Sequence, residues 1–229
     1  MSRSAQLSRR TGETDIQVSL DLEGGLVGKL ETGIGFFDHM LALLARHGRI
    51  GLGLTAQGDL ETGSHHTVED AGIVLGQALD QALGDRAAIR RYGHAVVPMD
   101  EARAACALDV SGRPYCAVTG LELPPGAIAG FEHEAAEEFF RAVASGGRLT
   151  LHLELPAGTV GGFEHEAAEE SFRAVASSAR LTLHVELQAG TNAHHMIEAC
   201  FKAFARALRA AVAIDPDEQA VPSTKGTLT

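Results

Sequence analysis

The pentapeptide His-His-x-x-Glu occurs twice in this chain of 229 residues. One copy begins at His65 and ends at Glu69, and the other begins at His194 and ends at Glu198. Imidazole and carboxylate groups are common ligands of manganese, iron, zinc and nickel, and composition does not choose among these metals. A single histidine pair is weak evidence, because it can simply be exposed or cap a helix. Its recurrence makes a metal site the leading hypothesis, although the His-Glu-x-x-His arrangement of zinc proteases is absent.

The spacing within each motif predicts which of its side chains share one face of a helix. Residues four apart on a helix point nearly the same way, and residues three apart are neighbours. Glu69 can therefore join His65 or His66 on one face. Adjacent residues diverge by about 100° around the helix axis, so one pair of histidines cannot easily hold one ion. We expect two metal positions, each with ligands from more than one segment or subunit.

Other residues could also serve a metal or an anion. His39 lies upstream of the first pair and follows Asp38, which could orient its imidazole. His47 precedes a glycine at a predicted helix end, where a cation interacts favourably with the helix dipole. Arg90, Arg91 and Arg113 are the best candidates for anion contacts, because the guanidinium fork matches phosphate geometry, although Arg90 can equally be a surface arginine.

Three further segments have weaker signals. The tail around Ser223 and Lys225 has the hydroxyls, cation and glycine that can wrap a phosphate, a composition also common in disordered tails. Glu13 has no local explanation and, judged alone, is solvated. His133 and His165 belong to a repeated acidic helix, and we expect them to be exposed.

Composition limits the class of protein. The net charge of -11 argues against a general binder of nucleic acid or anionic membranes, yet a few arginines suffice for a small phosphorylated ligand. The N-terminus lacks the apolar run of a signal peptide, and no apolar stretch is long enough to span a bilayer. Three cysteines without CxxC spacing indicate reduced, mostly buried thiols. We therefore expect a cytoplasmic globular protein.

Hydrophobic periodicity predicts alternating strands and helices. The expected strands are 15–22, 50–55, 95–97, 104–110, 115–119 and 149–155, and the expected helices are 36–46, 67–83, 134–144 and 193–212. In each half of the chain a helix, a strand and a loop lead into a histidine pair. This faint repetition suggests two related halves in a pseudo-symmetric arrangement.

A second repetition is much sharper. Residues 130–159 recur as residues 162–191, with a period of 32 residues and only five differences. The differences are Phe139/Ser171, Gly146/Ser178, Gly147/Ala179, Leu153/Val185 and Pro156/Gln188. Two copies cannot occupy one place in a sheet. Phe139 favours the helix of copy one in the core, whereas direct connection to His194 favours the strand of copy two. We expect one copy to be displaced outward.

Taken together, the motifs resemble the imidazoleglycerol-phosphate dehydratase family of histidine biosynthesis. The matching segments cover nearly the whole chain and are RRTGETDIQVSLDL, GFFDHMLALLARHG, SHHTVEDAGIVLGQALDQALG, PMDEA, DVSGRPY, NAHHMIEACFKAFARALRAAV and PSTKGTL. The resemblance implies an α+β fold like domain 2 of ribosomal protein S5. It implies one domain over 1–229 with two pseudo-symmetric α/β halves, about 1–91 and 92–229, each a mostly antiparallel sheet covered by helices. The duplicated units, about 128–159 and 160–191, lie in the second half.

The resemblance also implies an activity and an assembly. The family removes water from imidazole glycerol phosphate to give imidazole acetol phosphate, with two manganese ions in each active site. Other divalent transition metals remain alternatives. The family assembles into trimers and then a 24-subunit shell that shares metal ligands between subunits, and the tandem copy could alter this assembly.

Individual residues carry over from the family to this chain. The metal ligands implied by the resemblance are His39, His65, His66, Glu69, His194, His195 and Glu198. The implied substrate contacts are Glu13, the stretch from His39 to His47, Arg91, Arg113, Ser223 and Lys225. Glu13, Glu69 and Glu198 are the candidates for catalytic proton transfer.

The chain departs from the family in two features, the tandem copy and one ligand. Where the family usually has a histidine before the second pair, this chain has Glu138 in copy one or Glu170 in copy two. Two alternatives to the dehydratase therefore stay open. One is an impaired or non-catalytic metal-binding variant, and the other is a different metal-dependent lyase or phosphatase.

Overall fold

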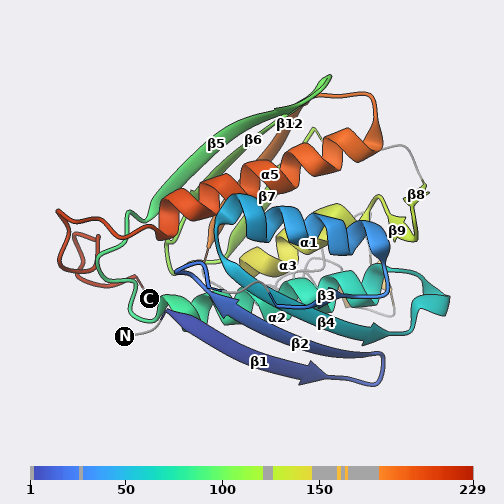
Figure 1. The fold of residues 1–229 in the computed structure, drawn as a ribbon, viewed down its shortest axis with the longest axis horizontal. Helices are drawn as coiled ribbons and strands as arrows, with labels where there is room; N and C mark the ends of the chain where they lie inside the picture. The colour runs from blue at the N-terminus through green and yellow to red at the C-terminus, as the bar shows by residue number, and fades with distance from the viewer. Residues whose placement is uncertain are drawn as a thin grey trace.

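Two four-stranded sheets enclose a layer of helices (Figure 1). The computed structural model describes residues 3–25, 28–120, 126–145, 159–160, 163–164 and 181–228. The combination of mixed sheets and helices confirms the predicted α+β class. Among the described residues, no helix has the length and apolar character needed to cross a membrane.

The first sheet and its helices come from the N-terminal part of the chain. Its elements are β1 (Ser4–Arg10), β2 (Thr14–Asp21), β3 (Leu30–Glu31), α1 (Gly35–Gly48), β4 (Gly51–Gly58), the short 3-10 helix η1 (Leu60–Thr62) and α2 (His65–Leu83). The strand order is β1-β2-β4-β3. The edge strand β3 runs parallel to β4, while the other neighbours are antiparallel.

The second sheet repeats this topology. Its elements are β5 (Tyr92–Met99), β6 (Ala102–Asp109), β7 (Tyr115–Thr119), α3 (Ala135–Ser145), β12 (Thr182–Ala189) and α5 (Ala193–Val212). The order is β5-β6-β12-β7, and again the edge strand, β7, is parallel to its neighbour. Two small hairpins are formed by β8 (Ala127–Ile128) with β9 (Phe131–Glu132) and by β10 (Thr159–Val160) with β11 (Phe163–Glu164). Both large sheets therefore follow one β-β-β-α-β-α plan.

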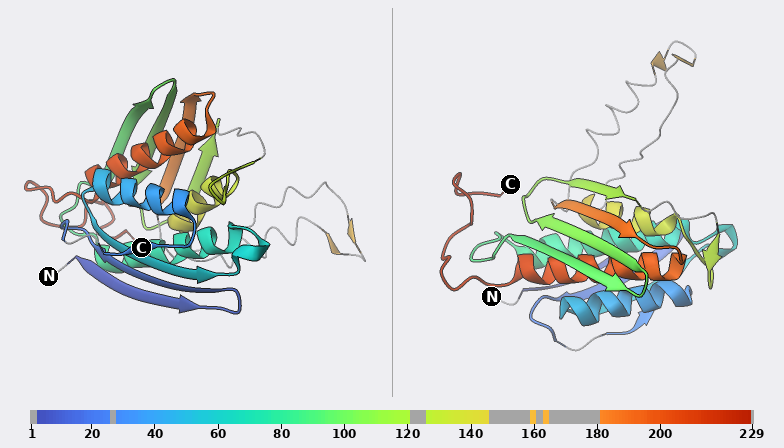
Figure 2. Two further views of the ribbon diagram at one scale, coloured as in Figure 1. Left: turned by 45° about the vertical axis from the view of Figure 1, so that its right-hand side comes forward. Right: turned by 90° about the horizontal axis from the view of Figure 1, so that it is seen from above.

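The helices pack across the two halves. Helix α2 lies on β1 and β2, and α5 lies on β5 and β6. The remaining helices cross over, because α1 packs beside α5 and α3 packs beside α2 (Figures 1 and 2). The first helix of each half thus contacts the last helix of the other half.

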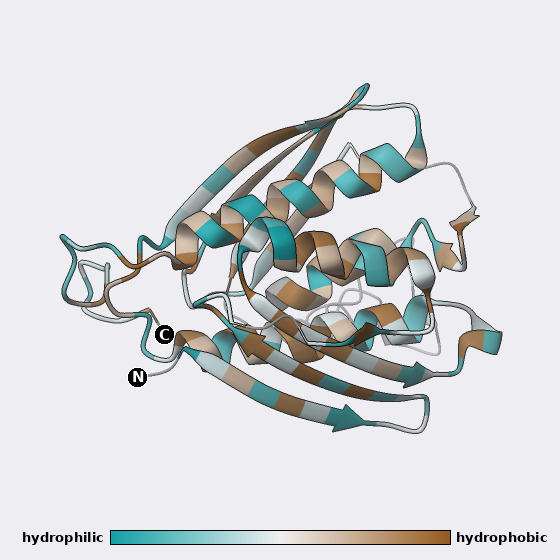
Figure 3. Ribbon diagram, viewed as in Figure 1, coloured by the Kyte–Doolittle hydropathy of each residue, from teal (hydrophilic) through white to brown (hydrophobic). Residues whose placement is uncertain are grey.

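Period-two patterning positions the sheets. Along β2, Ile16, Val18 and Leu20 are buried while the residues between them are not. Figure 3 shows this alternation as bands of opposite colour along the strands. Each such side chain contributes about 1.5–3 kcal/mol when it leaves water. The strand β1 was missed from sequence because its pattern is mostly polar, with only Ala5 fully buried.

The two large elements that the tandem repeat adds to the core come from different copies. Helix α3 belongs to copy one, whereas β12 belongs to copy two and pairs with both β6 and β7. Phe139 and the direct connection to His194 therefore each predicted the right element. The expectation that one copy is displaced outward is wrong, because both copies contribute to the core. The predicted strand 149–155 of copy one lies outside the described residues.

Phe139 explains the choice of helix. Its ring is fully buried, stacks on Phe201 with ring centroids 4.9 Å apart, and meets Phe37 edge-on at 5.4 Å. Copy two has Ser171 at the matching position. His133, beside this helix, was predicted to be exposed, but it is only 7% exposed, so that prediction was wrong. His165 of copy two lies outside the described residues.

The three cysteines fit the sequence expectation. Cys106 and Cys200 are buried and Cys116 is half-buried, and all three are free thiols.

Two deletions of 32 residues test why the core contains the helix of copy one together with the strand of copy two. Deleting 146–177 joins the helix of copy one to the strand of copy two, whereas deleting 130–161 leaves copy two alone. The products differ only by Phe139 or Ser171 at one helical position. Because removal of a buried phenyl ring costs about 3–5 kcal/mol, the product with serine should have the lower free energy of unfolding by at least this much.

Urea unfolding of both products under identical conditions measures this difference. A Ser171→Phe substitution in the less stable product should restore its unfolding midpoint. Equal midpoints for the two deletions would show that Phe139 does not select the helix.

Candidate metal centre

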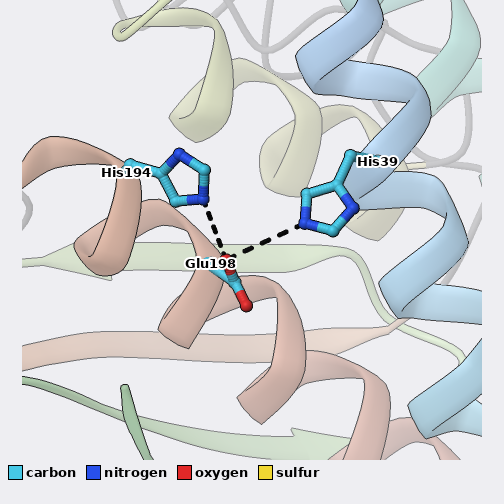
Figure 4. Close-up of side chains that lie close together, drawn as sticks. All are labelled: His39, His194 and Glu198. Atoms are coloured by element: carbon cyan, nitrogen blue, oxygen red, sulfur yellow. Dashed lines mark hydrogen bonds and ion pairs between the residues drawn. The ribbon is translucent and has the colours of Figure 1, made fainter. Parts of the chain in front are cut away.

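Three predicted metal ligands come together where α1 crosses α5. His39 projects from α1, and His194 and Glu198 project from the first two turns of α5 (Figure 4). The Nε2 atom of His194 lies 3.0 Å from Oε2 of Glu198, and Nε2 of His39 lies 3.9 Å from the same oxygen. One donor atom from each residue lies within 4.8 Å of the others. This geometry brings a residue from each half into one cluster.

Glu198 is the buried member of this cluster. It is 6% exposed, and its second oxygen forms an ion pair with Lys202 one helical turn further on. Burial would raise the pKa of Glu198, but the hydrogen bond and charge of Lys202, with those of His194, lower it below the ordinary value. The carboxylate therefore stays ionised at neutral pH, with Oε2 directed between two imidazoles.

The cluster fits a divalent transition metal. Two imidazole nitrogens and an anionic carboxylate oxygen are suitable donors for manganese, iron or zinc. The charge balance also fits, since Lys202 neutralises only one side of Glu198 and the other side faces two groups that can donate electron pairs.

A related arrangement lies where α2 meets α3. Nε2 of His65 is 3.6 Å from Oε2 of Glu69, one turn along α2. Burial raises the pKa of Glu69, His65 opposes this, and the nearby charge of Glu138 on α3 raises it further. Glu138 is thus the copy-one carboxylate whose charge acts on Glu69, while Glu170 of copy two lies outside the described residues.

The second histidine of each pair points elsewhere, as the helical geometry predicted. Nδ1 of His66 lies 3.0 Å from Asp59, and Nδ1 of His195 lies 2.7 Å from Glu101. Neither histidine belongs to a three-donor cluster among the described residues. The predicted orienting group Asp38 is different: it accepts hydrogen bonds from the backbone and hydroxyl of Thr32 at the start of α1. Asp38 is therefore not an orienting partner of His39, and that interpretation was wrong.

One carboxylate and one amide fix the starts of the two histidine-bearing helices. Glu132 of copy one accepts hydrogen bonds from the backbone N–H and the hydroxyl of Ser64, at 2.7 and 2.6 Å, just before α2. Before α5, Oδ1 of Asn192 accepts from the backbone N–H groups of His194 and His195. These bonds satisfy helix donors that have no intrahelical partner, and they set the direction of the first turn.

The predicted anion contacts lie at the far end of α5. Arg91 donates its backbone N–H to Ala211, seventeen residues after His194, which corresponds to roughly 25 Å along the helix. Its guanidinium binds both oxygens of Asp109 and the carbonyl of Pro222, so Arg91 links the sheet to the tail.

The other predicted substrate contacts are divided between the two ends. Ser223 and Lys225 share a turn of the tail, where the hydroxyl of Ser223 accepts from the backbone of Lys225. Arg113 is exposed in a turn held by Ser111. Glu13, in contrast, lies beside the first motif, with Oε2 4.0 Å from Nδ1 of His66.

His47 lies in the last turn of α1, as predicted, but its environment is cationic. Burial lowers its pKa, and Lys202, Arg206 and Arg46 lower it further. The imidazole is therefore predominantly neutral at neutral pH, so favourable interaction of a histidine cation with the helix dipole does not explain this residue.

Sequence reasoning missed Asp59, Glu101, Glu132 and Lys202. Only Lys202 had a local signal, since it follows Glu198 at the i,i+4 spacing of a helical ion pair. Asp59 contacts His66 across a turn, Glu132 contacts Ser64 of the other half, and Glu101 contacts His195 across 94 residues of the same half.

Comparison with known proteins identifies a single family. A family model described as imidazoleglycerol-phosphate dehydratase matches residues 32–159 and 154–208, and these segments overlap near the junction of the two copies. The imidazoleglycerol-phosphate dehydratase of Moorella thermoacetica is 48% identical over 228 residues, which is 100% of both chains. That of Jannaschia sp. is 45% identical over 227 residues, 99% of this chain and 100% of the relative.

Solved structures agree with the sequence matches. The enzyme of the same name from Staphylococcus aureus superposes with a TM-score of 0.69 at 33% identity, covering 92% of this chain and 99% of that chain. The one from Pyrococcus furiosus gives a TM-score of 0.70 at 31% identity, covering 97% and 100%. The likeness thus extends over sequence and fold together.

Substitution of Glu132 tests how the start of α2 is held. The hydrogen bonds from Ser64 hold the pKa of Glu132 below its ordinary value. A lowered pKa in the folded state stabilises the fold above the unfolded pKa, and this contribution is lost as pH falls through the lowered pKa. Glu132→Gln should therefore cost about 1 kcal/mol at pH 7 and much less at pH 3.

Urea unfolding at both pH values measures the effect. Glu134→Gln, a neighbouring exposed carboxylate, is the control. An equal cost of Glu132→Gln at both pH values would contradict a role for the ionised carboxylate.

Proposed function

Since the chain belongs to the imidazoleglycerol-phosphate dehydratase family of hydro-lyases, we propose that it dehydrates imidazole glycerol phosphate to imidazole acetol phosphate in histidine biosynthesis, with divalent metal ions. The observation that carries the metal dependence is the cluster of His39, His194 and Glu198, assembled from two helices of different halves.

Two metal positions follow from the pseudo-symmetry. His39, His194 and Glu198 would hold one ion, and His65, Glu69 and Glu138 would provide the corresponding ligands for a second. Manganese suits these sets, because histidine and carboxylate donors are among its common ligands. A bound ion would act as a Lewis acid and a template for the substrate imidazole.

Proton transfer needs a carboxylate that is not already a proposed metal ligand. Dehydration removes a proton from carbon and expels hydroxide, which leaves as water once protonated. Glu69 and Glu198 each face an imidazole of their own motif. Glu13 is the better general base, because its side chain is 60% exposed and lies only 4.0 Å from Nδ1 of His66. Its oxygen can accept the proton without losing a metal ligand.

The substrate phosphate would be anchored by Arg113, Ser223 and Lys225. Roughly 25 Å separates the tail end of α5 from its histidine end, too far for one small substrate to span within a chain. The two sets can meet only if they come from different subunits. We therefore infer a homo-oligomer with shared sites. Membership of the family, rather than this distance, is the ground for proposing trimers that assemble into a 24-subunit shell. Arg91 would hold the tail in position and also contact the phosphate with its remaining N–H groups.

An impaired metal-binding variant is the main alternative, because of the tandem copy. The intact order β5-β6-β12-β7 and the buried α3 argue against it, since the elements around the site are complete. A different metal-dependent lyase or phosphatase has no comparable support from the family match.

Activity of the purified protein is the direct test. With manganese it should form imidazole acetol phosphate, and removal of metal by a chelator should abolish turnover until manganese is restored. Glu198→Gln should lower kcat/KM by at least about 100-fold, because it removes an anionic ligand. Glu23→Gln, an exposed carboxylate at the end of β2, is the control. No product at any metal load would sink the dehydratase assignment.

The second metal position has its own test. Glu138→Gln should remove or weaken one of two bound manganese equivalents, whereas Glu137→Gln in the same turn should not, because Glu137 pairs with Arg141 instead. Titration calorimetry gives the stoichiometry. Two equivalents with unchanged affinity in Glu138→Gln would exclude Glu138 as a ligand, and Glu138→His should retain both.

A further inference from the structure

Two carboxylates outside the His-His-x-x-Glu motifs contact the same atom in each half. Asp59, in the turn between β4 and η1, lies 3.0 Å from Nδ1 of His66. Glu101, in the turn between β5 and β6, lies 2.7 Å from Nδ1 of His195. In both motifs the contacted residue is the second histidine, which the three-donor cluster does not use.

The chemistry of the contact fixes the imidazole tautomer. An ionised carboxylate only accepts hydrogen bonds, so Nδ1 must carry the proton in both contacts. Nε2 is then left with its lone pair, as the atom able to bind a metal. In metal sites a histidine commonly donates its other ring N–H to a carboxylate, which fixes the ring and raises its basicity.

Glu101 also fixes the backbone that carries His195. Its other oxygen accepts from the backbone N–H groups of Asn192 at 2.9 Å and Thr191 at 3.3 Å. One side chain therefore sets both the ring of His195 and the chain leading into α5. Because β5 and β6 are a hairpin of the second sheet, this contact also ties the helix start to the sheet below it.

The carboxylates in the hairpin turns of the two sheets have different partners. The hairpin turn of the first sheet carries Glu13, and the matching turn of the second sheet carries Glu101. Glu13 stays 4.0 Å from Nδ1 of His66, because Asp59 already occupies that nitrogen. Glu13 can therefore act on substrate, whereas Glu101 is committed to His195.

From this geometry we propose that Asp59 and Glu101 are positioning residues of the metal centre. Each holds the second histidine of one motif with Nε2 directed to a metal that another subunit completes. This role depends on the proposed metal-dependent function, since His66 and His195 matter only if they are ligands. Neither carboxylate contacts the metal or the substrate.

Substitution of Glu101 in the full-length protein tests the proposal, with manganese as the probe. Glu101→Ala should weaken manganese binding about 10- to 100-fold in titration calorimetry, while kcat at saturating manganese stays within a few-fold of wild type. Glu101→Gln keeps an acceptor oxygen and should recover part of the affinity. Asp59→Asn should behave like Glu101→Gln.

Glu186→Gln is the control. Glu186 lies on β12 in the same half, and its carboxylate accepts a hydrogen bond from the side chain of Gln188. It should leave manganese affinity unchanged, which separates a specific hydrogen bond from a general loss of negative charge. Thermal unfolding of metal-free protein shows whether a variant is merely unstable.

The outcomes separate this proposal from the proposed function. Wild-type manganese affinity in Glu101→Ala would overturn the positioning role, even if the enzyme is active. A lowered melting temperature without lower affinity would also overturn it, because that pattern describes a structural residue. Wild-type protein that binds manganese but never turns over substrate would reject the dehydratase function while leaving the effect of Glu101→Ala on affinity intact.

Discussion

The crossed packing of α1 on α5 and of α3 on α2 is the contact on which the site depends. His39 on α1, a proposed metal ligand, meets His194 and Glu198 on α5 only because each half places its first helix against the last helix of the other. The aromatic rings of Phe37, Phe131 and Phe139 fill the space between these helix pairs. Their burial supplies the free energy that holds the crossing, so the ligand geometry is set by an apolar core rather than by the ligands themselves.

That core also explains how an ionised Glu198 is tolerated at 6% exposure. A buried charge is costly unless it is paired and hydrogen-bonded. Lys202 satisfies one oxygen, and the imidazole of His194 approaches the other. Among the described residues, the ion-pair partners of this second oxygen are the imidazoles of His39 and His194, with no lysine or arginine on that side. The proposed divalent ion would supply a counter-charge on this side, and its binding would be linked to folding.

Sequence patterns predicted what is local in this chain. Helical spacing separated His65 from His66 and His194 from His195, and apolar periodicity located α1, α2, α3 and α5. The strand β1 was missed because its surroundings, rather than its own apolar residues, hold it in the sheet. Asp38 was assigned to the wrong partner because a carboxylate beside a histidine can equally well fix the start of its helix. Asp59 follows the last strand of the first sheet, and Glu101 lies 94 residues before His195. Neither contact has a sequence spacing that predicts it.

The fold takes its helix from copy one and its strand from copy two, and the choice of helix can be explained by comparing two free-energy costs. The connection between Ser145 and Thr182 is long because of the tandem copy, but the entropy of closing a connection rises by only about 0.6 kcal/mol for each doubling of length. Two or three doublings cost roughly 1–2 kcal/mol. Giving up Phe139 for Ser171 in the helix would cost about 3–5 kcal/mol. The strand is chosen by a different constraint, since β12 runs directly into the loop that Glu101 and Asn192 hold at the start of α5. The core therefore keeps the helix that packs best and the strand that leads to the histidines.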